Sequence, residues 1–172
     1  MIVLAIGGTR SGKSEFAERY AARLSDAVTV VIPRPPLAGD DLDLAARVAI
    51  HRARRPSGLA TVECRSALPE AVLAAPGVAL IDSLGTWVAN TLEFAVDTDA
   101  LINALRTRTH PTVIVSEEVG LAIHAATPAG RQFTDRLGEL NTAVAAIADS
   151  VFLIVAGRAL RLEDADSIVE MG

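Results

Sequence analysis

The sequence predicts an α/β fold in which helices flank a mostly parallel sheet, with an antiparallel edge at the C-terminus. Short apolar runs alternate with helical patterns along the chain, which is the order expected of βα units. The composition is 51% hydrophobic and low in aromatics, which suits parallel strands that are buried on both faces. The last apolar run precedes a segment of mixed basic and apolar residues, as an edge strand would have.

The first apolar run, residues 2–6, leads into a glycine-rich segment and then into a helical pattern from about Lys13 to Leu24. The segment fits the P-loop pattern G-x-x-x-x-G-K-[ST], and this context predicts a P-loop NTPase-like domain. The glycines let backbone N–H groups converge on phosphate oxygens, and the helix N-terminus adds positive potential. We predict that Lys13 contacts the β- and γ-phosphates and that the Ser14 hydroxyl ligates Mg²⁺. The predicted nucleotide-binding residues of this loop are Gly7, Gly8, Thr9, Arg10, Ser11, Gly12, Lys13 and Ser14.

The second apolar run, residues 28–32, is followed by three prolines that exclude regular structure. Arg34 lies among them, at the C-terminal end of a predicted strand, where open α/β sheets bind their ligands. A contact with nucleotide and a stiff surface loop are equally consistent with this position.

A helical pattern then runs from about Asp40 to Arg55, where a proline and a glycine end it. One stripe of this helix carries Arg47, His51 and Arg54. The arginines would attract a polyphosphate and would favour the neutral, nucleophilic form of the imidazole. The alternative is a solvated basic helix end, which the helix dipole also favours.

The next apolar runs, residues 59–63 and 78–82, each end in a carboxylate, Glu63 and Asp82, with a short helix expected over residues 67–75 between them. An apolar strand that ends in aspartate downstream of a phosphate loop predicts a second Mg²⁺ ligand, so Asp82 is expected beside Ser14.

The second half of the chain continues the alternation. Residues 84–94 are predicted to be helical around Trp87, for which core packing is a commoner role than stacking on a ligand. A strand over 112–116 precedes Glu117 and Glu118, which either point into the ligand crevice or begin a solvated loop. A helix over 130–149 carries the polar Asn141, as an interface or a site residue. A strand over 151–156, an edge strand over 158–162 and a loosely held tail complete the prediction.

Length and composition exclude several classes of protein. The 172 residues suit a single domain, residues 1–172, and the net charge of −5 argues against a general nucleic-acid binder. The longest apolar runs are far shorter than a membrane span, and no basic region precedes the first of them, so no targeting segment is expected. The single cysteine, Cys64, excludes an intramolecular disulfide and favours a reduced, cytoplasmic protein.

The motifs together resemble one family, the bifunctional adenosylcobinamide kinase/adenosylcobinamide-phosphate guanylyltransferases of cobalamin biosynthesis. Besides the P-loop, the resemblance includes D-x-D-L-x-x-R-V-x-x-H-R-x-R-R from Asp41 to Arg55 and L-I-D-S-L-x-x-W-x-x-N from Leu80 to Asn90. It continues with S-E-E-V-G-L-x-I from Ser116 to Ile123 and G-R-x-F-x-D-x-x-G-x-x-N from Gly130 to Asn141. The histidine helix and the last of these segments are specific to the family.

The resemblance implies two reactions. The enzyme would phosphorylate adenosylcobinamide with ATP or GTP, using Lys13, Ser14-bound Mg²⁺ and Asp82. It would then transfer GMP from GTP to adenosylcobinamide phosphate through a guanylyl group on His51, giving adenosylcobinamide-GDP. The resemblance also implies a homotrimer. It implies a nucleotide site lined, beyond the P-loop, by Arg34, Pro35, Pro36, Arg52, Ala53, Arg54, Arg55, Glu63 and Asp82.

The chain departs from the family pattern at positions outside the phosphate motif. Residues 31–36 replace a Y-I-A-T-A-like segment, and Glu117 replaces the asparagine of the family's N-E-V-G. Gly85 and Thr86 replace bulkier residues before Trp87. Such changes would alter base or corrinoid selectivity, or remove one activity. Two other functions therefore stay open: a small-molecule kinase with a structural His51, and a nucleotide-dependent switch, against which the missing N-K-x-D motif argues.

Overall fold

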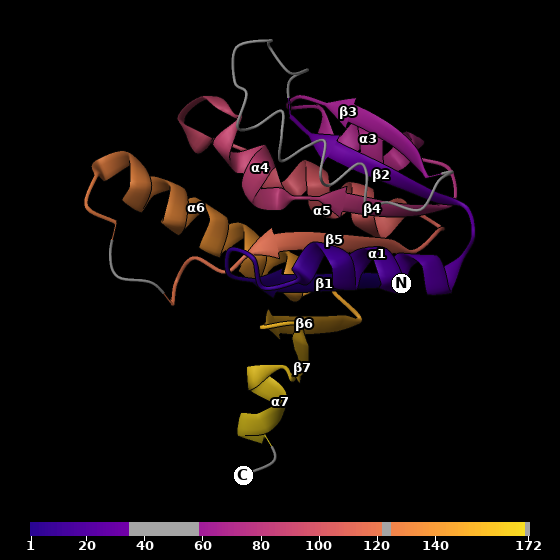
Figure 1. Ribbon diagram of the computed structural model, residues 1–172. Helices are drawn as coiled ribbons and strands as arrows, with labels where there is room; N and C mark the ends of the chain where they lie inside the picture. The colour runs from indigo at the N-terminus through magenta and orange to yellow at the C-terminus, as the bar shows by residue number, and fades with distance from the viewer. Residues whose placement is uncertain (35–58, 122–124, 171–172) are drawn as a thin grey trace.

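The computed structural model describes residues 1–34, 59–121 and 125–170, and its core is a single seven-stranded sheet (Figure 1). The strands are β1 (Ile2–Gly7), β2 (Val28–Pro33), β3 (Ala60–Cys64), β4 (Val78–Asp82), β5 (Thr112–Glu117), β6 (Ser150–Val155) and β7 (Arg158–Leu162). The helices are α1 (Lys13–Leu24), α3 (Leu68–Ala74), α4 (Leu84–Ala89), α5 (Thr98–Thr107), α6 (Pro128–Ala145) and α7 (Ala165–Glu170), with a 3₁₀ turn, η1 (Leu92–Phe94).

The strand order is β3-β2-β4-β5-β1-β6-β7, and every neighbouring pair is parallel except β6 with β7. The predicted fold class, with its antiparallel edge at the C-terminus, is confirmed. Because parallel strands end at one edge of a sheet, the residues after β1, β4 and β5 meet at the same edge. Gly7 is in register with Glu117, and Asp82 with Val115. This strand order therefore places Gly7, Asp82 and Glu117 at one edge of the sheet.

Alternating side chains of the strands divide the core between the two faces of the sheet. On one face Val3 and Val113 belong to the cluster that also contains Ala17 and Ala21 of α1. On the other face Leu4 packs in the cluster that contains buried residues of α3, α4, α5 and α6. Successive side chains of a strand point to opposite faces of the sheet, and helices cover both faces, which explains why the strands are nearly continuous apolar runs. Within the described ranges no helix is long and apolar enough to cross a membrane.

Two predicted helices have wrong boundaries. The helix expected over 84–94 ends at Ala89, and the chain then forms η1, in which Glu93 and Phe94 have positive φ angles of 53° and 57°. Asn90 Nδ2 and Thr91 Oγ1 donate to the carbonyl oxygens of Thr86 and Trp87 at 2.8 and 2.9 Å. These bonds satisfy the last carbonyls of α4, so its end needs no further turn.

The helix expected over 130–149 begins earlier and ends earlier. Thr127 caps it, because its hydroxyl accepts a bond from Gly130 N at 3.1 Å, and Pro128 occupies the first turn. The tail expected to be loosely held contains α7, which has no buried residue. Trp87 is 2% exposed and donates from Nε1 to Ser66 O at 3.1 Å, so it packs in the core.

Arg108, which follows α5, ties three parts of the chain together. Its Nη1 donates to the carbonyl oxygens of Val72 and Ala75 at 2.5 and 2.7 Å, and its Nη2 donates to Gly77 O. Burial lowers the pKa of this guanidinium from its ordinary value. Arg108 therefore connects the end of α5 to α3 and to the loop between α3 and β4.

Replacing Arg108 with alanine will lower the free energy of unfolding by about 2–3 kcal/mol, because charge-assisted bonds to several carbonyl oxygens are lost together. Urea unfolding measures this as a lower midpoint with an unchanged slope. Arg108→Lys will recover part of the loss, since an ammonium reaches fewer of the three carbonyls. A midpoint equal to that of the unsubstituted protein would contradict this role.

Candidate active site

The loop between β1 and α1 has the shape that its motif predicts. Gly12, the N-cap of α1, has a φ of 94°, in the left-handed region that favours glycine. A side chain at Gly7 would place its Cβ 2.5 Å from Ile154 O and 2.6 Å from Ser11 Oγ, so this position also requires glycine. Gly157, in the turn after β6, donates to Ser11 O at 2.8 Å. The loop is thus held by the turn that follows β6, the strand paired with β1.

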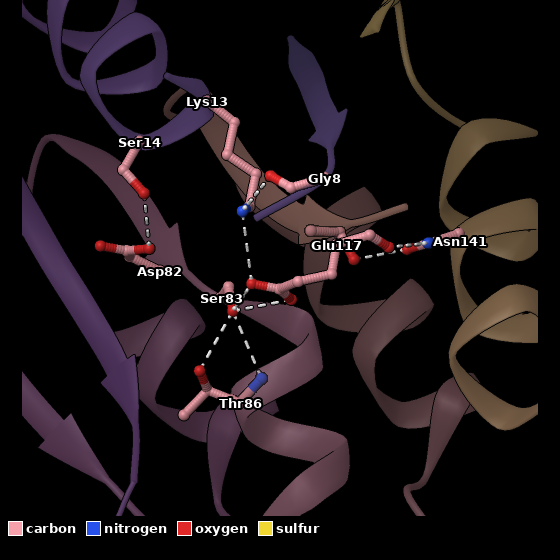
Figure 2. A network of polar contacts seen from close by, with 9 residues as sticks. Gly8, Lys13, Ser14, Asp82, Ser83, Thr86, Glu117 and Asn141 are labelled. Carbon is pink, nitrogen blue, oxygen red and sulfur yellow. Dashed lines mark hydrogen bonds and ion pairs between the residues drawn. The ribbon is translucent and has the colours of Figure 1, made fainter. Parts of the chain in front are cut away.

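Ser14 and Asp82 lie next to each other, although 68 residues separate them in the sequence. The Ser14 hydroxyl donates to Asp82 Oδ1 at 3.4 Å (Figure 2). Both groups offer oxygen ligands, which Mg²⁺ prefers, and they are close enough to reach one ion. Among the described residues no cluster of three or more His, Cys, Asp or Glu side chains forms a metal cage by itself. This pair fits an ion such as Mg²⁺, which is commonly held by one or two side chains together with phosphate oxygens and water.

Lys13 faces a carboxylate from the neighbouring strand. Its Nζ lies 3.8 Å from Glu117 Oε1 and donates to Gly8 O at 3.3 Å. The Ser83 hydroxyl lies 3.0 and 3.1 Å from the two carboxylate oxygens of Glu117 (Figure 2). The ammonium and the carboxylate are therefore adjacent at the predicted phosphate site.

The structure shows which of the two adjacent glutamates, Glu117 and Glu118, faces the site. Glu117 points into the site, whereas Glu118 Oε1 accepts bonds from Gly120 N and Leu121 N at 2.6 and 3.3 Å. Glu118 therefore orders the start of its own loop. Ser83 was not predicted as a site residue; its position as the N-cap directly after Asp82 was the only signal.

Asn141 of α6 supports the same strand end. Its Oδ1 accepts a bond from Ser116 Oγ at 2.6 Å, and its Nδ2 donates to Glu117 O at 3.0 Å. Of the two roles left open for this residue, the structure shows a contact with the end of β5, which fixes the backbone at Glu117.

Arg34 and Glu63 form an ion pair at the ends of β2 and β3. Arg34 Nη2 lies 2.7 Å from Glu63 Oε1, and the Arg34 side chain is only 7% exposed. Its Nη1 is buried without a hydrogen-bond partner among the described residues. Of the two possibilities left open for Arg34, the surface position is therefore wrong, and the contact with nucleotide stays a prediction. At the next residue of β3, burial and, to a smaller extent, the charge of Glu70 raise the pKa of the Cys64 thiol to about 11.

Several predicted site residues lie outside the described part of the chain. They are Pro35, Pro36, Arg47, His51, Arg52, Ala53, Arg54 and Arg55. The structure brings together the P-loop, Asp82 and Glu117. It places the pair of Arg34 and Glu63 at the ends of β2 and β3, which lie two and three strands away from β5.

The glycine-rich loop connects β1 to α1, and Asp82 ends β4, which is separated from β1 by β5. This arrangement defines a P-loop nucleotide-binding fold. A solved structure supports this class: the flagellar accessory protein FlaH from Methanocaldococcus jannaschii superposes with a TM-score of 0.52 at 16% identity. The alignment covers 94% of this chain and 77% of that chain. At this identity the likeness concerns the fold alone.

The sequence identifies the family within that class. The model of the family described as "Cobinamide kinase / cobinamide phosphate guanyltransferase" matches residues 3–162, and the chain belongs to this family of enzymes. It is 33% identical over 169 residues to the bifunctional adenosylcobalamin biosynthesis protein CobP of Pseudomonas aeruginosa, covering 93% of this chain and 96% of that protein. It is 32% identical over 185 residues to the bifunctional protein CobU of Salmonella typhimurium, covering 95% and 100%. The resemblance found in the motifs is confirmed.

Proposed function

We propose that the chain carries out both reactions of its family and that one nucleotide site serves them. Adenosylcobinamide is first phosphorylated, and GMP then passes from GTP to adenosylcobinamide phosphate through a guanylyl-histidine at His51. The observation that carries the proposal is the match to the family over residues 3–162 together with the convergence of Lys13, Ser14 and Asp82 at one sheet edge.

In the first reaction the chain acts mainly by positioning and by neutralising charge. The amides of the loop from Gly8 to Gly12 hold the phosphate chain, and Lys13 bridges the β- and γ-phosphates. Ser14 and Asp82 would hold Mg²⁺, which when bound would neutralise negative charge on the phosphates. Because this machinery contacts phosphates only, it does not by itself distinguish ATP from GTP as the donor.

In the second reaction an imidazole nitrogen of His51 forms a bond to the α-phosphorus of GTP. The bond from that phosphorus to the bridging oxygen breaks, and pyrophosphate leaves. A phosphate oxygen of adenosylcobinamide phosphate then attacks the same phosphorus and releases the imidazole. The remaining nucleotide contacts are proposed to come from Arg34, Pro35, Pro36, Arg52, Ala53, Arg54, Arg55 and Glu63.

The proposal includes a homotrimer and a cytoplasmic location. The trimer rests on the resemblance to the family. The location rests on the single cysteine, which fits a reducing compartment.

The proposed intermediate is tested with GTP labelled at its α-phosphate. After incubation with Mg²⁺ and denaturation, the protein will retain a label that is labile in acid and stable in base, as a phosphoramidate should be. GTP labelled at the γ-phosphate is the matched control and will leave no such label. A folded protein that binds GTP but takes up no α-label would remove the transferase half of the proposal.

A further inference from the structure

The backbone of Glu117 is fixed beside the P-loop. Glu117 is the last residue of β5 and is in register with Gly7, and the following N–H, of Glu118, donates to Gly7 O at 3.1 Å. Asn141 holds the Glu117 carbonyl oxygen from the other side. The side chain therefore starts from a defined point, at the edge of the sheet where the phosphates are proposed to bind.

The carboxylate is held in turn by residues of α4. Ser83 Oγ, the N-cap of that helix, lies within hydrogen-bond distance of both of its oxygens, and Thr86 N donates to the same hydroxyl at 3.3 Å. A side chain at Gly85 would place its Cβ 2.9 Å from Glu117 Cδ and closer still to Oε2. Glu117 and Gly85 are both departures from the family pattern, and they meet in space. The glycine leaves the room that the carboxylate occupies.

The carboxylate is also within reach of a substrate. The Glu117 side chain is 31% exposed, compared with 11% for Lys13, and its Oε1 lies 3.8 Å from Lys13 Nζ. A phosphate oxygen bound to Lys13 would lie about 3 Å from the ammonium, so the carboxylate and the γ-phosphoryl group flank the same lysine. An acceptor hydroxyl that lies between them can donate its proton to the carboxylate while its oxygen approaches the γ-phosphorus.

We infer that Glu117 is the general base of the phosphoryl transfer, and that it holds Lys13 until a nucleotide arrives. The inference rests on the proposed kinase reaction. The phosphates replace Glu117 as the partner of Lys13, which leaves the carboxylate to accept a proton. The proton of the adenosylcobinamide hydroxyl moves to Glu117, the hydroxyl oxygen bonds to the γ-phosphorus, and the bond from that phosphorus to the bridging oxygen breaks. The nucleoside diphosphate is the leaving group.

Glu117→Gln tests this role, because it keeps the size of the side chain and its contact with Ser83. We expect the kcat of adenosylcobinamide phosphorylation to fall by about a hundredfold or more, the range of general-base catalysis. The dissociation constant for ATP will stay equal or decrease, because a charged partner no longer competes with the phosphates for Lys13. Labelling by α-labelled GTP will persist, since that reaction deprotonates no hydroxyl. Glu118→Gln, which changes the adjacent carboxylate, will leave all three quantities unchanged.

A second variant, Gly85→Ala, displaces the carboxylate without removing it, and it will lower kcat about tenfold or more while ATP still binds. Phosphorylation by Glu117→Gln within threefold of the unsubstituted rate would overturn the inference. Parallel loss of ATP binding and of the α-label would also overturn it, because the residue would then serve the nucleotide site in general. If the unsubstituted protein phosphorylates no adenosylcobinamide, the proposed function fails instead.

Discussion

Replacing Lys13 with alanine will lower the rate of phosphoryl transfer to adenosylcobinamide by about a thousandfold or more, which corresponds to about 4 kcal/mol of transition-state stabilisation. Two effects combine. The positive charge at the β- and γ-phosphates is lost, and the Glu117 carboxylate, 3.8 Å from Nζ in the unsubstituted protein, is left to face the phosphates alone. Single-turnover assays with γ-labelled nucleotide measure the rate without interference from product release.

Two further variants separate these effects. Lys13→Arg keeps the charge but changes the geometry of the donors, so it will restore only part of the rate. The double variant Lys13→Ala/Glu117→Gln will bind nucleotide more tightly than Lys13→Ala alone, because the repulsive carboxylate is gone. A Lys13→Ala protein with a normal melting temperature and a rate within tenfold of the unsubstituted enzyme would show that the loop does not act as proposed.

Replacing His51 with asparagine will abolish the covalent label from α-labelled GTP and will leave phosphorylation of adenosylcobinamide largely intact. An asparagine amide can form hydrogen bonds much like an imidazole, but it offers no nucleophilic nitrogen lone pair. The label is measured after denaturation, and phosphorylation is measured on the same preparation. His110→Asn is the matched control, because His110 is exposed and precedes β5, at the sheet edge opposite the P-loop.

The outcomes show whether His51 is the nucleophile of the transferase reaction. Loss of the label with retained kinase activity assigns the transferase reaction to His51. A label that persists in His51→Asn would place the nucleophile elsewhere. Loss of both activities would indicate that the histidine helix supports the nucleotide site as a whole.

The positions of the strands along the chain were predictable, because strands that are buried on both faces of a sheet must be continuous apolar runs. All seven predicted strands are present, and the extent of β4, β5 and β6 differs from the prediction by at most one residue at either end. Helix ends were less predictable, because single side-chain bonds decide them. Thr91 and Asn90 bond back to the carbonyls of α4, and Thr127 begins α6 earlier than the apolar pattern indicates. A hydrophobic period does not contain this information.

The sequence by itself determined the family, the P-loop and the pairing of Ser14 with Asp82, because each depends on residues at fixed spacing or on a motif that ends a strand. Only the tertiary structure decided between Glu117 and Glu118, joined Ser83 and Lys13 to Glu117, and buried Arg34 against Glu63. These contacts join residues that are 29 to 104 positions apart, and they exist because the strand order places the ends of β1, β4 and β5 together and those of β2 and β3 together. The sequence shows which residues could form the site, and the strand order determines which of them come into contact.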